Sequence, residues 1–375
     1  MSIDIRTVKT KSDKVKFVKS QWKFYKNDPH FVPPIVMDRM KLLDTQKNPF
    51  YHHAEIELFL AYDGDEIVGR IAAITNELHN KTHNDNIGFF GFFECIDNQE
   101  VADALFDTAK KWLKEKGKDA IRGPVNPSMN DELGILVEGF DDSPRVLMTY
   151  NPKYYEKLIL NAGLTKAKDL YAYKLTQKSF MSDKLKRLHG LIREKYNINI
   201  REVNFKNKEQ FAKDVNVIKD VYNKAWVPNW GFVKITDEEF DYMVADLKMI
   251  ANPKFAYIAE VNGKPAGFHL GLPDINASLK YNKSGSTLGA LWHLFTKKKK
   301  MQYMRIIILG VLPEFQGKGV DAVMYYESGK RAGEAGLDYG EASWILEDNE
   351  MMKRGAAVTM NGELYKIYRL FEEGL

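Results

Sequence analysis

The sequence predicts an α/β protein with mixed β-sheets, built from two halves of similar layout. Three observations predict it: short β-rich runs alternate with helix-period segments, their order occurs twice, and no apolar run is long enough to cross a membrane. With 375 residues, the chain is long enough for two domains that each bury a core.

The first half begins with an alternating run over residues 3–8, which predicts a strand, and a helix-period segment over 13–27. Two β-rich runs, 56–62 and 66–75, flank Asp63-Gly64-Asp65, the composition of a tight hairpin turn. The other elements expected in this half are strands over 87–95, 120–122 and 169–175 and helices over 101–116 and 154–161.

The same order recurs in the second half, and its hairpin has the same spacing as the first. Ala61 and Gly69 correspond to Ala259 and Gly267 around the two turns. The expected elements are strands over 198–203, 256–261, 266–272, 305–311, 339–345 and 364–371, helices over 208–222 and 320–335, and a short helix from about Asn349. We therefore expect domains over 1–178 and 198–375, joined by a linker helix over 179–197.

The composition excludes several classes of protein. Lys and Arg number 55 and Asp and Glu 51, and this net charge of +4 is too small to indicate nucleic-acid binding. Cys95 is the single cysteine, which excludes an intrachain disulfide and a Cys-rich zinc site. Residues 1–14 lack the apolar segment of a signal peptide. We expect a cytoplasmic protein with no membrane span and no bound metal, whose oligomeric state the sequence leaves open.

Residues 306–320, which read IIILGVLPEFQGKGV, predict a phosphate-binding loop. An apolar strand enters a loop with two glycines that opens a helix, so backbone N–H groups and the positive helix end converge on one place. Glycine allows the backbone to approach a ligand closely, and Lys318 adds a positive charge. Taken alone, the segment is equally consistent with an ordinary strand-to-helix turn.

This loop resembles the acetyl-CoA pyrophosphate loop of the GNAT superfamily of acyltransferases, whose pattern is Gln/Arg-x-x-Gly-x-Gly/Ala. The resemblance rests on residues 311–313 (VLP) and 316–319 (QGKG) and extends over the second half. The first half is similar in layout only, because residues 94–100 (ECIDNQE) contain no glycine. With residues 226–232 (WVPNWGF) and 147–155 (LMTYNPKYY), the chain resembles a bacterial group of tandem GNAT proteins.

The resemblance implies two GNAT-like N-acyltransferase domains in tandem, the first degenerate, with one acyl-CoA site in the second. The expected activity is transfer of an acetyl or other acyl group from acyl-CoA to an amine of a small molecule. The residues implied for cofactor binding are Leu309, Gly310, Val311, Gln316, Gly317, Lys318, Gly319, Val320 and Asn349. Trp226, Asn229, Trp230 and Phe232 are candidates for substrate binding, and core-capping aromatics are the alternative interpretation.

The catalytic residues are less well defined. The general-acid Tyr that many GNAT enzymes place seven residues after the Asn falls here at Ala356. Tyr368, or Tyr365 on the same expected strand, is the substitute candidate. Glu341 is a candidate base, because a base must accept the proton of the amine.

Three further residues bear on the same site. Glu347 and His269 are additional candidate bases, although a His on a strand is more often structural. Asp321 stands where Gly or Ala is usual, and a carboxylate there repels a pyrophosphate unless the side chain turns away.

Two other functions stay open. A non-catalytic acyl-CoA-binding or regulatory protein is one. The other is a Fem-type transferase that takes its acyl group from aminoacyl-tRNA, which calls for a more basic surface than this chain has.

Two more segments are informative. Residues 291–295 (LWHLF) followed by four lysines read as an amphipathic piece with a basic end, which fits a membrane surface, an acidic acyl carrier or a solvated loop. His79 and His83 lie in a polar stretch that predicts an exposed loop.

Overall fold

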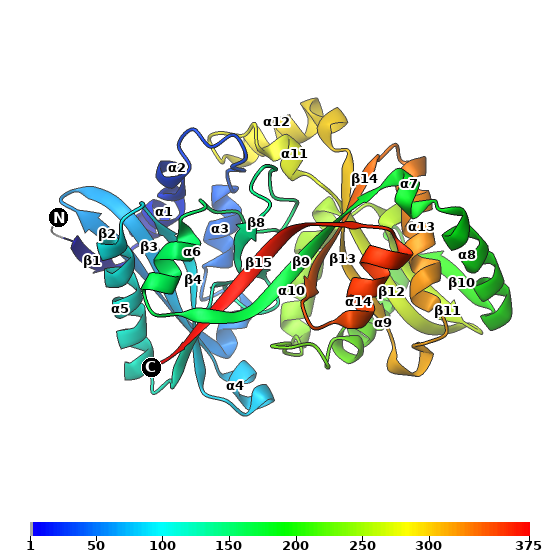
Figure 1. Cartoon of the computed structure of the whole chain (residues 1–375), viewed down its shortest axis with the longest axis horizontal. Coiled ribbons are helices and arrows are strands. Elements are labelled where there is room, and N and C mark those ends of the chain that lie inside the picture. Colours follow the sequence, from blue (N-terminus) through cyan, green and yellow to red (C-terminus); the bar gives the residue numbers. More distant parts are fainter. Residues whose placement is uncertain (1–2) are drawn as a thin grey trace. The chain divides into compact units, whose positions relative to one another are not determined.

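The computed structural model describes residues 3–375, so Met1 and Ser2 of the expected first domain lie outside the described residues. The chain forms two compact α/β units (Figure 1). Unit 1 comprises Met1–Asp169, Asn276–Lys298 and Lys366–Leu375, and unit 2 comprises Leu170–Ile275 and Lys299–Tyr365. This division differs from two contiguous halves, because β9 (Thr165–Thr176) and β15 (Glu363–Gly374) each contribute residues to both units.

Unit 1 is built on a sheet in which β1 (Ile3–Thr7), β2 (Ala54–Asp63), β3 (Glu66–Asn76) and β4 (Ile87–Cys95) pair antiparallel in sequence order. β4 then pairs parallel with β5 (Ala120–Gly123), and the end of β15 pairs antiparallel with β5 and with β8 (Ile135–Glu138). The remaining elements of this unit are α1 (Lys11–Lys19), α2 (Gln21–Phe24), α3 (Val36–Leu42), α4 (Glu77–His83), α5 (Gln99–Glu115), β6 (Val125–Asn126), β7 (Glu132–Leu133), α6 (Tyr155–Asn161), α11 (Asn276–Leu279) and α12 (Thr287–Thr296).

Unit 2 repeats this plan. β10 (Ile198–Glu202), β11 (Ala256–Val261), β12 (Lys264–Pro273) and β13 (Tyr303–Val311) pair antiparallel, β13 pairs parallel with β14 (Tyr339–Leu346), and β14 pairs antiparallel with β9. Its helices are α7 (Gln177–Phe180), α8 (Asp183–Tyr196), α9 (Lys208–Ala225), α10 (Asp237–Ile250), α13 (Val320–Glu334) and α14 (Glu350–Arg354). The segment expected as a linker helix therefore contains α8, which belongs to unit 2.

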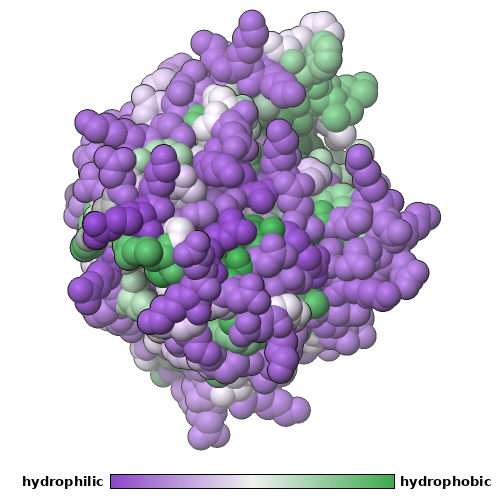
Figure 2. All heavy atoms as spheres, turned by 90° about the vertical axis from the view of Figure 1, so that its right-hand side faces the viewer, coloured by the Kyte–Doolittle hydropathy of each residue, from purple (hydrophilic) through white to green (hydrophobic). Residues whose placement is uncertain are grey.

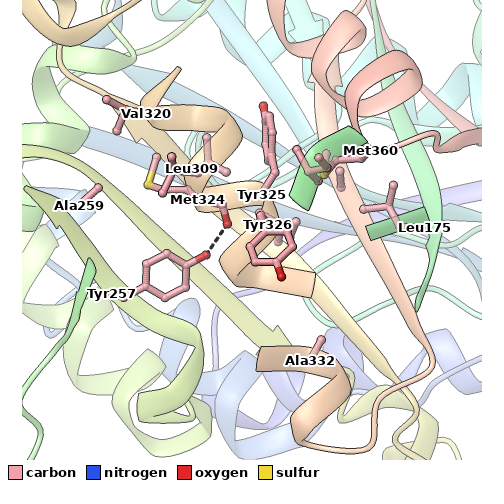
Figure 3. Close-up of a cluster of buried hydrophobic side chains, with 14 of the residues drawn as sticks. Leu175, Tyr257, Ala259, Leu309, Val320, Met324, Tyr325, Tyr326, Ala332 and Met360 are labelled. Carbon is pink, nitrogen blue, oxygen red and sulfur yellow. Dashed lines mark hydrogen bonds between the residues drawn. The ribbon is translucent and has the colours of Figure 1, made fainter. Parts of the chain in front are cut away.

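Helices cover both faces of the unit 2 sheet. A Cβ on Gly267 of β12 would meet Met324 of α13, whereas a Cβ on Gly310 of β13 would meet Trp226 at the end of α9. Gly267 pairs with Val311, and successive residues of a strand point to opposite faces, so α13 and α9 lie on opposite sides. Figure 3 shows the core on the α13 side, where the Tyr257 hydroxyl donates to the Met324 carbonyl at 2.7 Å.

The expected duplication is confirmed at the level of register. Ala61 pairs with Gly69 and Ala259 pairs with Gly267, and a β-bulge follows each pair at the next residue of the first strand. A one-residue slip would turn every side chain to the other face, so equal registers place equivalent residues of the two units on equivalent faces.

The expectation of a loop around His79 and His83 is wrong, and so is the expected exposure of His79, whereas His83 is exposed as expected. These residues lie in α4, which begins after Asn76, whose side chain accepts a hydrogen bond from the His79 N–H at 3.0 Å. The His79 ring is fully buried and packs edge-on against Phe89 at 4.9 Å. Burial, assisted by the neighbouring His83, lowers the pKa of His79 to about 3. The polar composition of this segment predicts a loop, but the segment forms a helix with one buried face.

Candidate functional site

The loop between β13 and α13 has the backbone geometry of an anion site. Gly317 and Gly319 have φ angles of 72° and 74°, in the left-handed region that favours glycine. Gly319 is the N-cap residue of α13 and provides no side-chain cap, so the first N–H groups of this 15-residue helix have no cap from that residue. A Cβ on Gly317 would meet no atom within 4 Å, whereas one on Gly319 would lie 2.7 Å from Ile192 of α8. Gly317 therefore borders open space, and Gly319 is needed for packing as well.

The polar residues of the loop are held by its own backbone. The Lys318 ammonium donates to the Glu314 carbonyl at 2.9 Å and lies 4.9 Å from the centre of the Phe315 ring. The Gln316 amide donates to the Val311 carbonyl at 3.3 Å. Val320 is fully buried, so it anchors the helix start and offers a ligand only its backbone.

Asp321 lies in the first turn of α13, at the same helix start. Its carboxylate interacts with the backbone N–H groups of Asp321 and Ala322, which lower its pKa, while burial, the larger effect, raises that pKa above the ordinary value. The carboxylate therefore engages donors of the helix start that an incoming phosphate would use.

Next to the loop, the two central parallel strands part. β13 and β14 pair from Tyr303↔Tyr339 to Ile306↔Ala342, whereas β13 stays paired with β12 as far as Val311. The last residues of β13 thus extend beyond its pairing with β14. Such a strand edge can pair with an extended ligand that carries amide groups, as in strand addition. This is where Leu309, Gly310 and Val311 were expected to contact the cofactor.

The aromatic loop between α9 and α10 covers β13 from the other face. Trp226 stacks on Tyr222, with ring centres 5.0 Å apart, and its ring lies against the backbone of Gly310. Phe232 is buried and packs against Tyr222 at 5.5 Å, which is a core position, while Trp230 is partly exposed.

Two of the expected site residues contact each other. The Asn349 side-chain amide donates to the Asn229 oxygen at 3.4 Å. The Asn349 oxygen also accepts from the Met352 N–H at 3.1 Å, so Asn349 is the N-cap of α14. A residue expected to bind the cofactor, Asn349, thus contacts a residue expected to bind the substrate, Asn229.

A buried polar cluster lies where β13 and β14 part. Glu341 is fully buried and pairs across the strands with Arg305, whose Nε lies 3.9 Å from the carboxylate. Ser343 donates its hydroxyl hydrogen to Glu341 at 2.5 Å and accepts from Arg305 at 2.8 Å. The hydroxyl of Tyr365, which is partly exposed, also donates to Glu341. Sequence reasoning missed Arg305 and Ser343; the available signal was an Arg and a Glu within apolar strands, since buried charges are rare unless paired.

The other candidates are placed elsewhere. Tyr368 is fully buried and belongs to unit 1. His269 is buried, stacks on Tyr257 at 4.5 Å, and has Nδ1 3.1 Å from the Phe255 carbonyl oxygen. Burial lowers its pKa to about 3, so the ring is neutral at pH 7. Ala356 is buried in a π-helical turn, and Glu347, which follows β14, is partly exposed.

The corresponding place in unit 1 is filled by the protein itself. Three residues separate β4 from α5, and the Asn98 side chain caps the helix by accepting from the Val101 N–H at 3.3 Å. Tyr154 donates to the Cys95 carbonyl at 2.8 Å, and the Tyr155 hydroxyl accepts from the Cys95 N–H at 3.0 Å.

The segment after β5 also occupies the edge of β4. The Phe92 N–H donates to the Asn126 side chain at 2.6 Å, and a Cβ on Gly91 would lie 1.8 Å from the Val125 carbonyl oxygen. Both the strand edge and the helix start of unit 1 thus have internal partners.

Two further findings concern residues 3–375. They contain no cluster of three or more His, Cys, Asp or Glu side chains arranged to hold a metal ion. No helix within them combines the length and the apolar character that a membrane span needs.

Comparison with solved structures defines the class of protein. A tandem GNAT protein from the clavulanic acid biosynthesis pathway aligns over 100% of this chain and 98% of its own, with a TM-score of 0.57 and 11% identity. A GCN5-related N-acetyltransferase from Sphaerobacter thermophilus aligns over 99% of this chain and 95% of its own, with a TM-score of 0.53 and 10% identity. The chain is a tandem GNAT-fold protein, as the sequence predicted.

The family follows from two bacterial relatives. Protein YghO of Escherichia coli (strain K12) is 33% identical over 378 residues, which cover 98% of this chain and 95% of the relative. The bacterial ceramide synthase of Caulobacter vibrioides is 32% identical over 385 residues, which cover 100% of this chain and 98% of the relative. The chain belongs to the family of these two proteins. No family model matches it.

Proposed function

We propose that unit 2 binds an acyl-CoA and transfers its acyl group to a primary amine, forming an amide and releasing CoA. One observation carries the proposal: a helix start without a side-chain cap from its N-cap residue lies beside a strand that extends beyond its parallel partner. An acyl-CoA combines a pyrophosphate with an extended arm that contains amides, so it matches both features at once.

The residues present fit such a ligand. The backbone around Gly317 and Gly319 and the first turn of α13 would bind the pyrophosphate, with Lys318 close by as a positive charge. The last residues of β13, Leu309 to Val311, would pair with the amides of the arm. The ligand supplies an acyl group activated as a thioester.

Tyr365 and Glu341 are the proposed catalytic pair. In the reaction the amine nitrogen bonds to the acyl carbon, the carbon–sulfur bond breaks, and one proton moves from nitrogen to sulfur. Tyr365 accepts that proton from the amine as it gives its own to Glu341, and the pair then returns a proton to sulfur. Arg305 and Ser343 hold the carboxylate in place through the contacts described above. The partly exposed Tyr365 thus takes the role expected for Tyr368.

We further propose that the acceptor is a long-chain amino alcohol. One relative is named a ceramide synthase, and a ceramide is the amide of a fatty acid with such an amine. The aromatic loop supports this class, because Trp226 and the partly exposed Trp230 offer an apolar wall beside β13 and Asn229 adds a polar group.

The test is an assay of the purified chain with palmitoyl-CoA and sphinganine, in which free thiol and amide product are both measured. Acetyl-CoA and a short polar amine serve as comparisons, and we expect the long-chain pair to give the highest kcat/KM. Tyr196→Phe is the matched control for Tyr365→Phe, because it removes a hydroxyl from α8 in the same unit. Tight binding of acyl-CoA without amide formation from any amine would instead favour a regulatory acyl-CoA-binding protein.

A further inference from the structure

Helix α12 turns its apolar side chains outward. Leu288, Leu291, Trp292 and Phe295 are 81%, 61%, 65% and 85% exposed, and their spacing of three and four residues places them on one face of the helix. A helix on the surface of a globular protein normally shows the opposite arrangement, with its apolar stripe toward the core. We call these four residues the α12 stripe.

The helix is fixed at both ends, so the stripe is held outward by the fold. Ser286 caps the helix by accepting from the Gly289 N–H at 3.1 Å, and the Gly285 carbonyl before it accepts from the Val36 N–H at 2.9 Å. After the helix, the Lys297 carbonyl accepts from the Ser278 hydroxyl at 3.1 Å. Figure 1 labels α12 beside α11, and Figure 2 shows that the face it draws is largely hydrophilic with a few apolar areas.

The segment around the stripe is strongly basic. Between Asp274 and Glu314 the sequence contains no acidic residue, and four consecutive lysines, Lys297 to Lys300, follow the helix directly. The last three of them are exposed. This segment connects β12 to β13. The equivalent connection between β3 and β4 is much shorter and contains one helix, α4. The stripe and the lysines thus lie in the part of the β12–β13 connection that has no counterpart between β3 and β4.

We propose that the α12 stripe and Lys298 to Lys300 dock this protein on the surface of a bilayer that contains anionic lipids. A fixed helix with an apolar face, a tryptophan on that face and a cationic flank matches helices that lie at the headgroup boundary. The lysines select this partner over an uncharged apolar surface, because basic residues next to such a helix are attracted to anionic headgroups. The inference is independent of the proposed acyl transfer.

The experiment is flotation of the full chain with vesicles of phosphatidylcholine alone and of phosphatidylcholine mixed with phosphatidylglycerol. We expect binding to the mixed vesicles that weakens as salt rises and is at least about tenfold weaker on phosphatidylcholine alone. The double variant Leu291→Ser/Phe295→Ser should lose binding to both vesicles by about tenfold or more. Both side chains are exposed, so the fold should survive, and circular dichroism and a thermal melt check this.

Two matched controls separate the stripe from general surface effects. Met249→Ser removes an apolar side chain that is 77% exposed on α10, and it should leave vesicle binding unchanged. The variant Lys298→Gln/Lys299→Gln/Lys300→Gln should lower binding to the anionic vesicles, and Lys9→Gln/Lys11→Gln/Lys19→Gln, with the same change of net charge at exposed positions, should not.

Three results would overturn the proposal: no binding of the wild-type chain to anionic vesicles, equal binding by the double variant, or binding of an acidic acyl carrier protein through the stripe without vesicle binding. None of these binding measurements depends on amide formation. A failure of the proposed enzyme activity can therefore be distinguished from a failure of membrane docking.

Discussion

The junction between β13 and α13 in unit 2 and the junction between β4 and α5 in unit 1 start from the same plan and end differently. In unit 2 a long loop with two left-handed glycines leads to a helix whose N-cap residue has no side chain. In unit 1 a turn of three residues ends in Asn98, whose side chain caps the helix. Two helices at equivalent places in the repeated plan thus begin in different ways, one with a side-chain cap and one without.

The strand edges differ in the same sense. In unit 1, Tyr154 and Tyr155 satisfy the backbone of Cys95 at the end of β4. In unit 2, the carbonyl of Val311 at the end of β13 accepts a hydrogen bond of 3.3 Å from the side chain of Gln316, a loop residue. A buried backbone group needs a partner, and unit 1 supplies it from its own side chains, whereas in the proposed function of unit 2 a ligand would supply it.

The largest expected effect comes from closing the unit 2 loop. Gly317→Glu puts a carboxylate into the open space beside the helix start, so we expect kcat/KM for acyl-CoA to fall by about a hundredfold or more. Gly263→Glu is the matched control, because Gly263 also has a positive φ and open space but lies in the β11–β12 turn. Thiol release measures both variants, and an equal loss in the two would mean that backbone strain, not the site, explains the effect.

The next effect distinguishes the two tyrosines that are candidates for catalysis. Tyr365→Phe removes the hydroxyl that donates to Glu341, and we expect kcat to fall by roughly 10- to 100-fold while KM for acyl-CoA stays within about twofold. The rival variant Tyr368→Phe changes a buried residue of unit 1. If both variants fold and kcat falls more in Tyr368→Phe than in Tyr365→Phe, Tyr368 would be the residue that transfers the proton, and the proposal for Tyr365 would be wrong.

A smaller effect of opposite sign concerns Asp321. Asp321→Asn removes the charge that competes with a phosphate for the helix start, so acyl-CoA should bind roughly three- to tenfold more tightly. Burial raises the pKa of Asp321, and only the ionised form repels the ligand, so wild-type affinity should increase as pH falls through that pKa. Asp321→Asn should lose this increase. Glu100→Gln, at the same second position of α5, should not change affinity, and calorimetry at several pH values compares the three proteins.

The smallest effect on binding is expected in unit 1. Asn98→Ala removes the cap of α5, so the protein should lose about 1 kcal/mol of stability, measured by urea unfolding. Acyl-CoA affinity should stay the same, because the short turn and the two tyrosines still fill this place. A second acyl-CoA bound to the variant would show that the cap alone closes unit 1.

The periodic and strongly apolar elements could be predicted from the sequence. The expected strands 87–95 and 256–261 are β4 and β11 to the residue, and the two hairpins expected to have equal spacing have the equivalent pairs Ala61↔Gly69 and Ala259↔Gly267. These patterns are local, and burial of one face enforces them. α4 was missed because the buried face of a short polar helix is set by its neighbour Phe89, which local composition does not reveal.

A contiguous motif marks only part of the proposed site. Residues 316–319 mark the loop in the sequence, and in the structure Gly317 and Gly319 have the left-handed φ angles that favour glycine. The cluster of Glu341, Arg305 and Tyr365 assembles from three strands, and nothing in the spacing along the chain indicates that they meet. β9 and β15 each contribute residues to both units, and no local pattern in the sequence marks where such a strand passes from one unit to the other.

The most direct test of the account is the number of acyl-CoA molecules that one chain binds. A calorimetric titration of palmitoyl-CoA, below its micelle concentration, into the wild-type chain and into Gly317→Glu measures this. We expect one site per wild-type chain and none in the variant. Two sites in the wild-type chain, or one site kept in Gly317→Glu, would contradict the claim that unit 2 alone has kept an open acyl-CoA site.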